Sequence, residues 1–196
     1  MTNIFEQVFF ITKKLRSEKL NQKPILIWFT GLSGSGKTTI SNSLEKLLFK
    51  KGYTTYCLDG DNIRKGLSKD LSFSERDRYE NIRRVAEVSK LFLDSGLIVL
   101  ASFISPLESQ RKLVKKIVGE KNFIEVFIST SQEVCENRDV KGLYEKARNG
   151  KIKNFTGISS KYEFPLNPFL KIDTSKSSIQ ESVDLIFKKI ENKING

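Results

Sequence analysis

The sequence contains no histidine among its 196 residues. This absence excludes histidine-based triads, zinc sites with histidine ligands and any histidine general base, so carboxylates would have to accept protons. Cysteine is scarce as well: Cys57 and Cys135 are the two in the chain, and they lack the C-x-x-C spacing. Reduced core thiols are therefore favoured over a disulfide or a metal site.

Long apolar runs and a leader pattern are also lacking. No apolar run approaches the roughly 20 residues of a membrane span, and the N-terminus lacks the basic, apolar and small-residue order of a signal peptide. We therefore expect a cytoplasmic protein with no membrane partner. The chain is 38% hydrophobic, which is enough to fill the core of one domain.

Acidic residues are fewer than basic ones, 23 against 34, and the formal net charge is +11. Such a charge can indicate nucleic-acid binding, but a kinase that binds two polyanionic nucleotides also needs a positive field around its cleft. Much of the excess lies in scattered lysine pairs, which more often form solvated faces. Small anionic substrates are therefore favoured over polynucleotides, and no nucleic-acid partner is expected.

A phosphate-binding pattern is present at residues 31–38, which read GLSGSGKT and fit G-x-x-x-x-G-K-[ST]. Its glycines allow backbone N–H groups to wrap a phosphate. Lys37 adds a charge for the β- and γ-phosphates, and Thr38 offers a hydroxyl to Mg²⁺. A strand expected over 24–30 precedes the loop and a helical apolar pattern follows it, which disfavours an ordinary glycine turn. The pattern predicts a triphosphate site.

Strand and helix patterns alternate along the rest of the chain. Further strands are expected over 53–58, 97–103, 123–128 and 169–172, with helices at 74–95 and 106–118 between them. The alternation predicts an α/β fold of the P-loop NTPase type: a doubly wound parallel sheet of about five strands, helices on both faces and a lid segment.

The N-terminal residues 1–22 form a separate unit in this prediction. Apolar residues at helical spacing, Ile4, Val8, Ile11 and Leu15, indicate a helix outside the nucleotide core, with packing or a dimer contact as its role. Residues 23–196 are expected to form a single domain.

Polar clusters follow the predicted strands, where ligands collect in such sheets. Asp59 and Asp61 could hold a Mg²⁺-bound water or accept a hydroxyl proton, or they could simply cap the next helix. Arg78 and Asn81 share a helix face that suits a nucleotide, although charged faces are usually just solvated. Ser105 before a proline has the pattern of a helix N-cap.

A basic segment begins at Arg138 and reads RDVKGLYEKARNGKIKNFTG. It contains three glycines and two aromatic residues among its lysines and arginines. A segment of this composition after the fourth strand is typical of a mobile lid over phosphates.

Six strings occur in order along the chain: GLSGSGKT, LDGDNIRKGL, RYENIRRVAEVSKLF, FISP, RDVKGLYEKAR and NFTGISSKYEFP. With them the sequence resembles the adenylylsulfate kinases (APS kinases) over roughly residues 20–190. The resemblance implies transfer of the γ-phosphate of MgATP to the 3′-hydroxyl of adenylyl sulfate (APS), giving 3′-phosphoadenylyl sulfate (PAPS) and ADP in sulfate assimilation. It implies ATP as co-substrate and Mg²⁺ as cofactor. A homodimer is also expected.

The resemblance also implies roles for particular residues. ATP would be bound by Gly31, Leu32, Ser33, Gly34, Ser35, Gly36, Lys37, Thr38, Thr39 and Arg138, and Mg²⁺ by Thr38 and Asp59. The catalytic residues would be Asp61, Lys37 and Ser105, of which Ser105 matches the family's phosphoserine position, although direct in-line transfer needs no covalent intermediate. The acceptor would be bound by Asp61, Arg64, Phe73, Arg78, Asn81, Ile104, Ser105, Lys141, Gly142, Leu143 and Phe155, with Phe73 and Phe155 clasping its adenine.

Four residues depart from the commonest family pattern: Leu107, Glu108, Val140 and Ser159. Glu108 inverts a charge near the second nucleotide, so the acceptor is less firmly implied than the reaction. One alternative is a 3′-kinase for another nucleotide mixed anhydride, such as a nucleoside diphosphoramidate. A remote alternative is a P-loop ATPase switch or nucleic-acid-binding protein.

Overall fold

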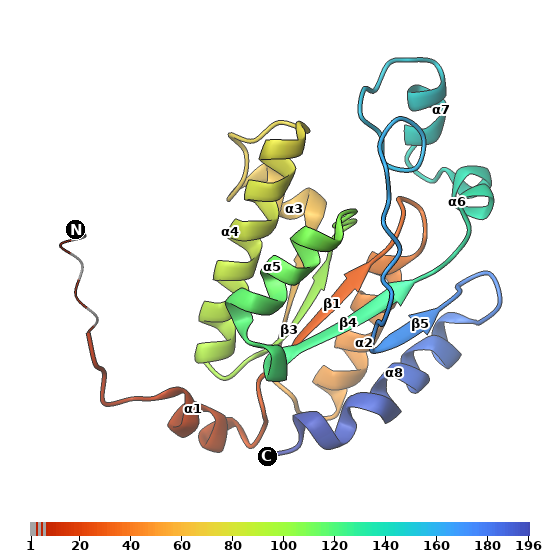
Figure 1. Ribbon diagram of the computed structural model, residues 1–196. Coiled ribbons are helices and arrows are strands. Elements are labelled where there is room, and N and C mark those ends of the chain that lie inside the picture. The colour runs from red at the N-terminus through yellow and green to blue at the C-terminus, as the bar shows by residue number, and fades with distance from the viewer. Residues whose placement is uncertain (1–2, 4, 6) are drawn as a thin grey trace.

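Five parallel strands form the centre of the molecule (Figure 1), which the computed structural model describes at residues 3, 5 and 7–196. The sheet order is β2-β3-β1-β4-β5, so β1 lies between β3 and β4. The bounds are Leu26–Thr30 for β1, Thr55–Asp59 for β2, Ile98–Ser102 for β3, Phe123–Ile128 for β4 and Leu170–Ile172 for β5. The predicted parallel sheet is confirmed, with every strand end within two residues of its expected place.

Helices cover both faces of the sheet (Figure 1). One face packs against α2 (Lys37–Lys50) and α8 (Ile179–Ile194), and the other against α4 (Glu75–Asp94) and α5 (Glu108–Val118). In β1, Ile27 and Phe29 enter the first core, whereas Leu26 and Trp28 enter the second. Because β1 is buried on both faces, its sequence is a continuous apolar run rather than an alternating one.

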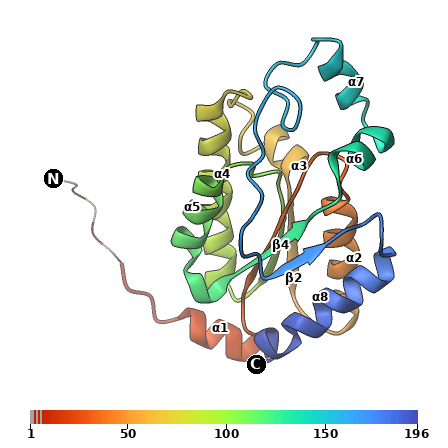
Figure 2. The ribbon, with the colours of Figure 1, turned by 45° about the vertical axis from the view of Figure 1, so that its right-hand side comes forward.

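A small lid stands beyond the carboxyl ends of the strands. It contains α6 (Gln132–Arg138) and α7 (Leu143–Arg148), after which the chain loops back and descends to β5 (Figures 1 and 2). Lid and sheet share a third core that includes Leu32, Phe127 and Tyr144. The short helices α3 (Gly60–Lys65) and η1 (Glu120–Asn122) complete the fold.

The predicted N-terminal helix is much shorter than expected. Helix α1 covers Lys13–Leu20, and its N-cap is Thr12, whose side chain accepts a hydrogen bond from the Leu15 N–H. Residues 7–12 are not helical and lead away from the body (Figure 2), so the prediction is wrong there, and Ile4 lies outside the described residues. The run Val8–Ile11 contains β-branched and aromatic residues, which favour a helix less than alanine or leucine does.

Among the residues that the structure describes, no helix combines the length and the apolar character that a membrane crossing requires.

Candidate active site

The glycine-rich loop joins β1 to α2 and is shaped by backbone that side chains would not tolerate. Gly31 has φ of 152°, and a Cβ there would lie 2.5 Å from the carbonyl oxygen of Ile128. Gly36, the N-cap of α2, has φ of 102° and supplies no side-chain cap. The first N–H groups of α2 are therefore left for an anion, and the helix dipole favours one there.

The loop's carbonyl oxygens are tied back into the protein. Those of Ser33 and Ser35 accept hydrogen bonds from Tyr144 Oη at 3.0 Å and from Thr174 Oγ1 at 2.8 Å. These contacts come from the lid and from the loop after β5, and neither was expected from the sequence. With the carbonyls held outward, the N–H groups of the loop are free to face a phosphate.

Lys37 is a buried cation in this loop. Its Nζ donates to the carbonyl oxygen of Leu32 at 2.8 Å. Burial lowers the pKa of the Lys37 ammonium to about 8, since the nearby charges of Asp59 and Asp61 offset the desolvation only in part. An ammonium held at this cost is stabilised by a polyanionic ligand.

Two carboxylates lie beside the loop at the end of β2. Thr38 Oγ1 donates to Asp59 Oδ2 at 2.8 Å, while Asp59 Oδ1 accepts from the Asp61 N–H at 3.0 Å. Asp59 is thus the N-cap of α3 as well as the partner of Thr38, so both readings of the sequence apply to it. Asp61 forms an exposed ion pair with Lys141, which reaches over from the lid.

Arg64 and Arg78 bring two guanidinium groups to the neighbouring surface. Arg64 lies 4.3 Å from the centre of the Phe73 ring, and Arg78 donates to the Asn154 carbonyl and to Thr156 Oγ1 at 2.6 and 2.9 Å. Burial lowers the pKa of both guanidinium groups. Their hydrogen bonds all go to neutral oxygens, so within the described part of the chain their charge has no direct counter-ion.

Asn81 lies one turn after Arg78 in α4 and is buried, 4% exposed. Its Oδ1 has no hydrogen-bond donor among the residues that the structure describes. A buried acceptor without a donor is costly, so this oxygen is a candidate contact for a ligand hydroxyl or amino group.

Phe73 and Phe155, the two residues predicted to clasp the adenine, have different surroundings. Phe73 is exposed and lies against Arg64, whereas Phe155 is buried and packs edge-on against Tyr144, with ring centres 5.0 Å apart. Of the other predicted lid residues, Arg138 donates to Thr174 Oγ1 at 2.8 Å in the loop after β5, and Gly142 is the N-cap of α7, which begins at Leu143.

Ser105 is not a helix N-cap, and that prediction is wrong. Helix α5 begins two residues later than expected, at Glu108, with Leu107 as N-cap. Ser105 has φ of 38°, is almost fully buried, and its Oγ accepts from Trp28 Nε1 and donates to Thr30 Oγ1, both at 3.0 Å. The Ser105 hydroxyl therefore forms tertiary hydrogen bonds in place of the helix-capping bond that the sequence pattern predicts.

Substitution of Ser105 by alanine should leave turnover within about tenfold of the wild type, since the buried, hydrogen-bonded hydroxyl is poorly placed to carry a phosphate. Stability should fall by about 1 to 3 kcal/mol, because the buried Trp28 N–H would lose its acceptor. Steady-state kinetics and thermal unfolding measure the two effects. Label from γ-labelled ATP trapped on Ser105 at the rate of turnover would contradict this result.

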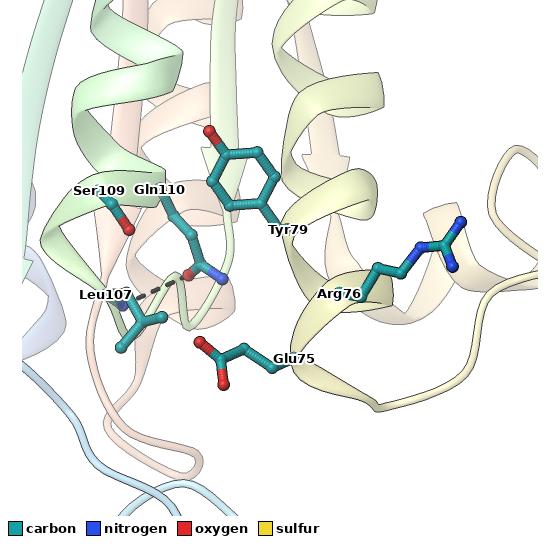
Figure 3. Close-up of a pocket in the computed structure, with 6 residues that line it drawn as sticks. All are labelled: Glu75, Arg76, Tyr79, Leu107, Ser109 and Gln110. Carbon is teal, nitrogen blue, oxygen red and sulfur yellow. Dashed lines mark hydrogen bonds between the residues drawn. The ribbon is translucent and has the colours of Figure 1, made fainter.

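The four departures from the family pattern fall at different places. Leu107 lines a pocket of about 530 Å³ between the starts of α4 and α5 (Figure 3), together with Glu75, Arg76, Tyr79, Ser109 and Gln110. Figure 3 shows the Arg76 guanidinium pointing away from this pocket. Glu108 forms an ion pair with Lys112 at 2.9 Å on its own helix, Val140 is exposed, and Ser159 Oγ accepts from the Phe155 N–H. None of these four side chains forms a hydrogen bond or an ion pair with Lys37 or Asp61.

Fold and site together define a P-loop phosphotransferase with a lid. A family model described as adenylylsulphate kinase matches residues 23–173, and the chain belongs to that family. It is 53% identical to the adenylyl-sulfate kinase of Marinobacter nauticus over 98% of this chain and 97% of the relative, and 55% identical to that of Bacteroides thetaiotaomicron over 97% and 96%. The APS kinase of Mycobacterium tuberculosis, solved in complex with AMPPNP and APS, superimposes with a TM-score of 0.84 at 46% identity, covering 86% of this chain and 98% of that one.

Proposed function

We propose that this chain transfers the γ-phosphate of ATP to the 3′-hydroxyl of adenylyl sulfate, giving 3′-phosphoadenylyl sulfate and ADP. The observation that carries the proposal is the pair of guanidinium groups of Arg64 and Arg78, which are half-buried and form no ion pair with any described residue, near a triphosphate loop. One anionic nucleotide fits the loop, and a second fits the arginines. Family membership is consistent with this acceptor.

Different residues of the chain have different roles in phosphate transfer. The loop N–H groups and Lys37 hold the β- and γ-phosphates and stabilise the charge that develops on the transferred group. Asp61 accepts the proton of the attacking hydroxyl. Lys141 pairs with Asp61 in the structure, so acceptor binding would have to displace Lys141 toward a phosphate. Arg64 and Arg78 grip the anionic end of the acceptor in forks that match paired oxygens.

Magnesium fits the site beside the loop. The hydroxyl of Thr38 and the carboxylate of Asp59 lie 2.8 Å apart, and hydroxyl and carboxylate oxygens are the hard ligands that Mg²⁺ takes alongside water and phosphate. We propose that Thr38 and Asp59 hold the ion, directly or through water. When bound, Mg²⁺ neutralises charge on the β- and γ-phosphates.

A panel of acceptors with MgATP tests the function. Adenylyl sulfate should give the highest kcat/KM, with a product heavier by one phosphate in mass spectrometry, and ATP hydrolysis should be slow without acceptor. A nucleoside diphosphoramidate that outperforms adenylyl sulfate would favour the alternative 3′-kinase. ATP hydrolysis that is indifferent to every acceptor would favour an ATPase switch.

We propose further that the chain forms a homodimer through residues 7–12. The side chains of Val8, Phe9, Phe10 and Ile11 are between 59% and 97% exposed, so four consecutive apolar residues do not pack on their own body. A contiguous apolar segment of this kind marks an interaction surface. A second copy is the partner we propose, since an arm that leads away from the body can reach a neighbouring subunit.

We propose that both substrates are nucleotides. We also propose that the protein is located in the cytoplasm.

Substitution of Phe9 and Phe10 by serine should shift the chain from dimer to monomer in sedimentation at micromolar concentration. The reason is the loss of the apolar area that the arm would bury. Phe49→Ser is the matched control, because Phe49 is equally exposed but lies near the end of α2. A wild-type monomer, or a dimer that survives the double substitution, would contradict the proposed interface.

A further inference from the structure

Arg111 is a buried cation of α5 for which the sequence suggested no role. It is 4% exposed, and its guanidinium reaches three different segments of the fold. Nη1 donates to the carbonyl oxygen of Ser105, and Nη2 donates to that of Glu163, each at 2.8 Å. Nε lies 3.0 Å from Glu125 Oε1 on β4. A lysine could not make all three contacts, since it lacks the planar fork.

The two carbonyl groups belong to segments that border the proposed acceptor site. Ser105 follows Ile104 at the end of β3 and has a left-handed backbone, φ of 38°, that is disfavoured for a residue with a side chain. Glu163 lies where the chain returns from the lid, and its N–H donates to the Pro106 carbonyl at 2.8 Å. Arg111 therefore clamps the end of β3 to the segment that descends from the lid.

A chain of hydroxyl groups continues from this clamp to the phosphate loop. Thr30, the residue before the loop, donates its proton to the Ile104 carbonyl at 2.7 Å. Its Oγ1 must then accept from Ser105 at 3.0 Å and from the Tyr162 hydroxyl at 2.9 Å. Ser105 accepts in turn from Trp28, so a shift of Ser105 would disturb the environment of Trp28.

The ion pair between Arg111 and Glu125 is not a good reason to assign Arg111 a role in stabilising the fold. Burial raises the pKa of the Glu125 carboxyl even with Arg111 beside it. Buried ion pairs often contribute no more than uncharged residues of similar shape, because desolvation offsets their attraction. The hydrogen bonds of Arg111 to the two carbonyl groups therefore give a better explanation of why this charge is buried.

We propose that Arg111 is a positioning residue for the acceptor nucleotide: by holding Ser105 and Glu163 it fixes the wall formed by Ile104 and Ser105. The proposal rests on the proposed function, in which that wall contacts adenylyl sulfate. It requires that loss of Arg111 weakens acceptor binding while the phosphate loop, held by other contacts, still binds ATP.

The double substitution Arg111→Met with Glu125→Gln tests this role, since it removes both charges and leaves neither group buried and ionised alone. We expect a lower melting temperature, because the carbonyl oxygens of Ser105 and Glu163 lose their donors, but a folded enzyme with KM for adenylyl sulfate raised at least about tenfold and KM for ATP within about twofold. Arg111→Lys should raise KM for adenylyl sulfate by a smaller factor, because one ammonium cannot serve both carbonyls. If the double variant does not fold, Arg111→Lys decides by the same KM comparison.

Trp28 supplies a readout independent of turnover, because it is the single tryptophan of the chain and donates to Ser105. Titration of adenylyl sulfate against Trp28 fluorescence should give a weaker Kd in the variants, and the emission of the unliganded double variant should be shifted. An unchanged Kd and KM for adenylyl sulfate, or equal losses for both substrates, would overturn the proposal. Wild-type enzyme that fails to phosphorylate adenylyl sulfate would instead reject the proposed function.

Discussion

Substitution of Lys37 by alanine should lower kcat by about 10² to 10³, the usual loss for one preorganised group that stabilises transition-state charge. Lys37 Nζ donates to the carbonyl of Leu32 from a buried position in the loop, so the ammonium is held where phosphate charge would accumulate. Removal of the side chain relieves a desolvated charge, so the fold should survive. Steady-state kinetics with a circular dichroism spectrum measure both effects.

Lys50→Ala is the matched control, because it removes an exposed lysine from the last turn of the same helix and should leave kcat unchanged. Near-normal turnover of a folded Lys37→Ala enzyme would reject the assignment of the ATP site.

The pH dependence of ATP binding gives a second test of Lys37. Burial lowers the pKa of its ammonium to about 8 without nucleotide. Bound phosphates favour the charged form and raise this pKa. ATP affinity should therefore be constant below pH 8 and fall above it by up to tenfold per pH unit, until the pKa of the complex is passed. Lys37→Ala should lose this dependence, which calorimetric titration from pH 7 to 10 would show.

Asp61→Asn should lower kcat by on the order of 10² or more while ATP affinity changes little, because the amide keeps the shape but cannot take the hydroxyl proton. Asp61 is exposed at the start of α3, so loss of its ion pair with Lys141 should cost little stability. Initial rates at varied ATP, acceptor and Mg²⁺ separate these effects.

The control for Asp61 is Asp70→Asn, which also breaks a surface ion pair, that of Asp70 with Arg84, but lies away from the loop. Its turnover should equal that of the wild type. If Asp61→Asn changed only the apparent affinity for Mg²⁺, Asp61 would be a metal residue, and the base would have to be Asp59 or solvent.

Patterns that are local in sequence were sufficient to predict the sheet and the phosphate loop. The central strands β1 and β3 are short, largely apolar runs, and the loop pattern specifies its own conformation, because glycines at 31 and 36 occupy backbone that a Cβ would forbid. The closeness of Thr38 to Asp59 also follows, since the loop after β1 and the end of β2 lie at the same edge of one parallel sheet, and Thr38 is at the start of the helix that follows this loop. The N-terminal helix was predicted too long, because apolar residues at helical spacing also occur in a non-helical segment such as 7–12, whose large apolar side chains are exposed.

The fold class, the triphosphate loop and the family could all be predicted from the amino-acid sequence, because each depends on residue types at fixed short spacing. The role of Ser105, the side chains that hold the loop carbonyls and the contacts of Arg111 became visible in the folded molecule alone. Those contacts join residues far apart along the chain, such as Trp28 with Ser105 and Ser35 with Thr174. The spacing of residues along the chain does not predict these contacts, because a buried polar group forms hydrogen bonds with the partners that the packing of strands and lid places next to it.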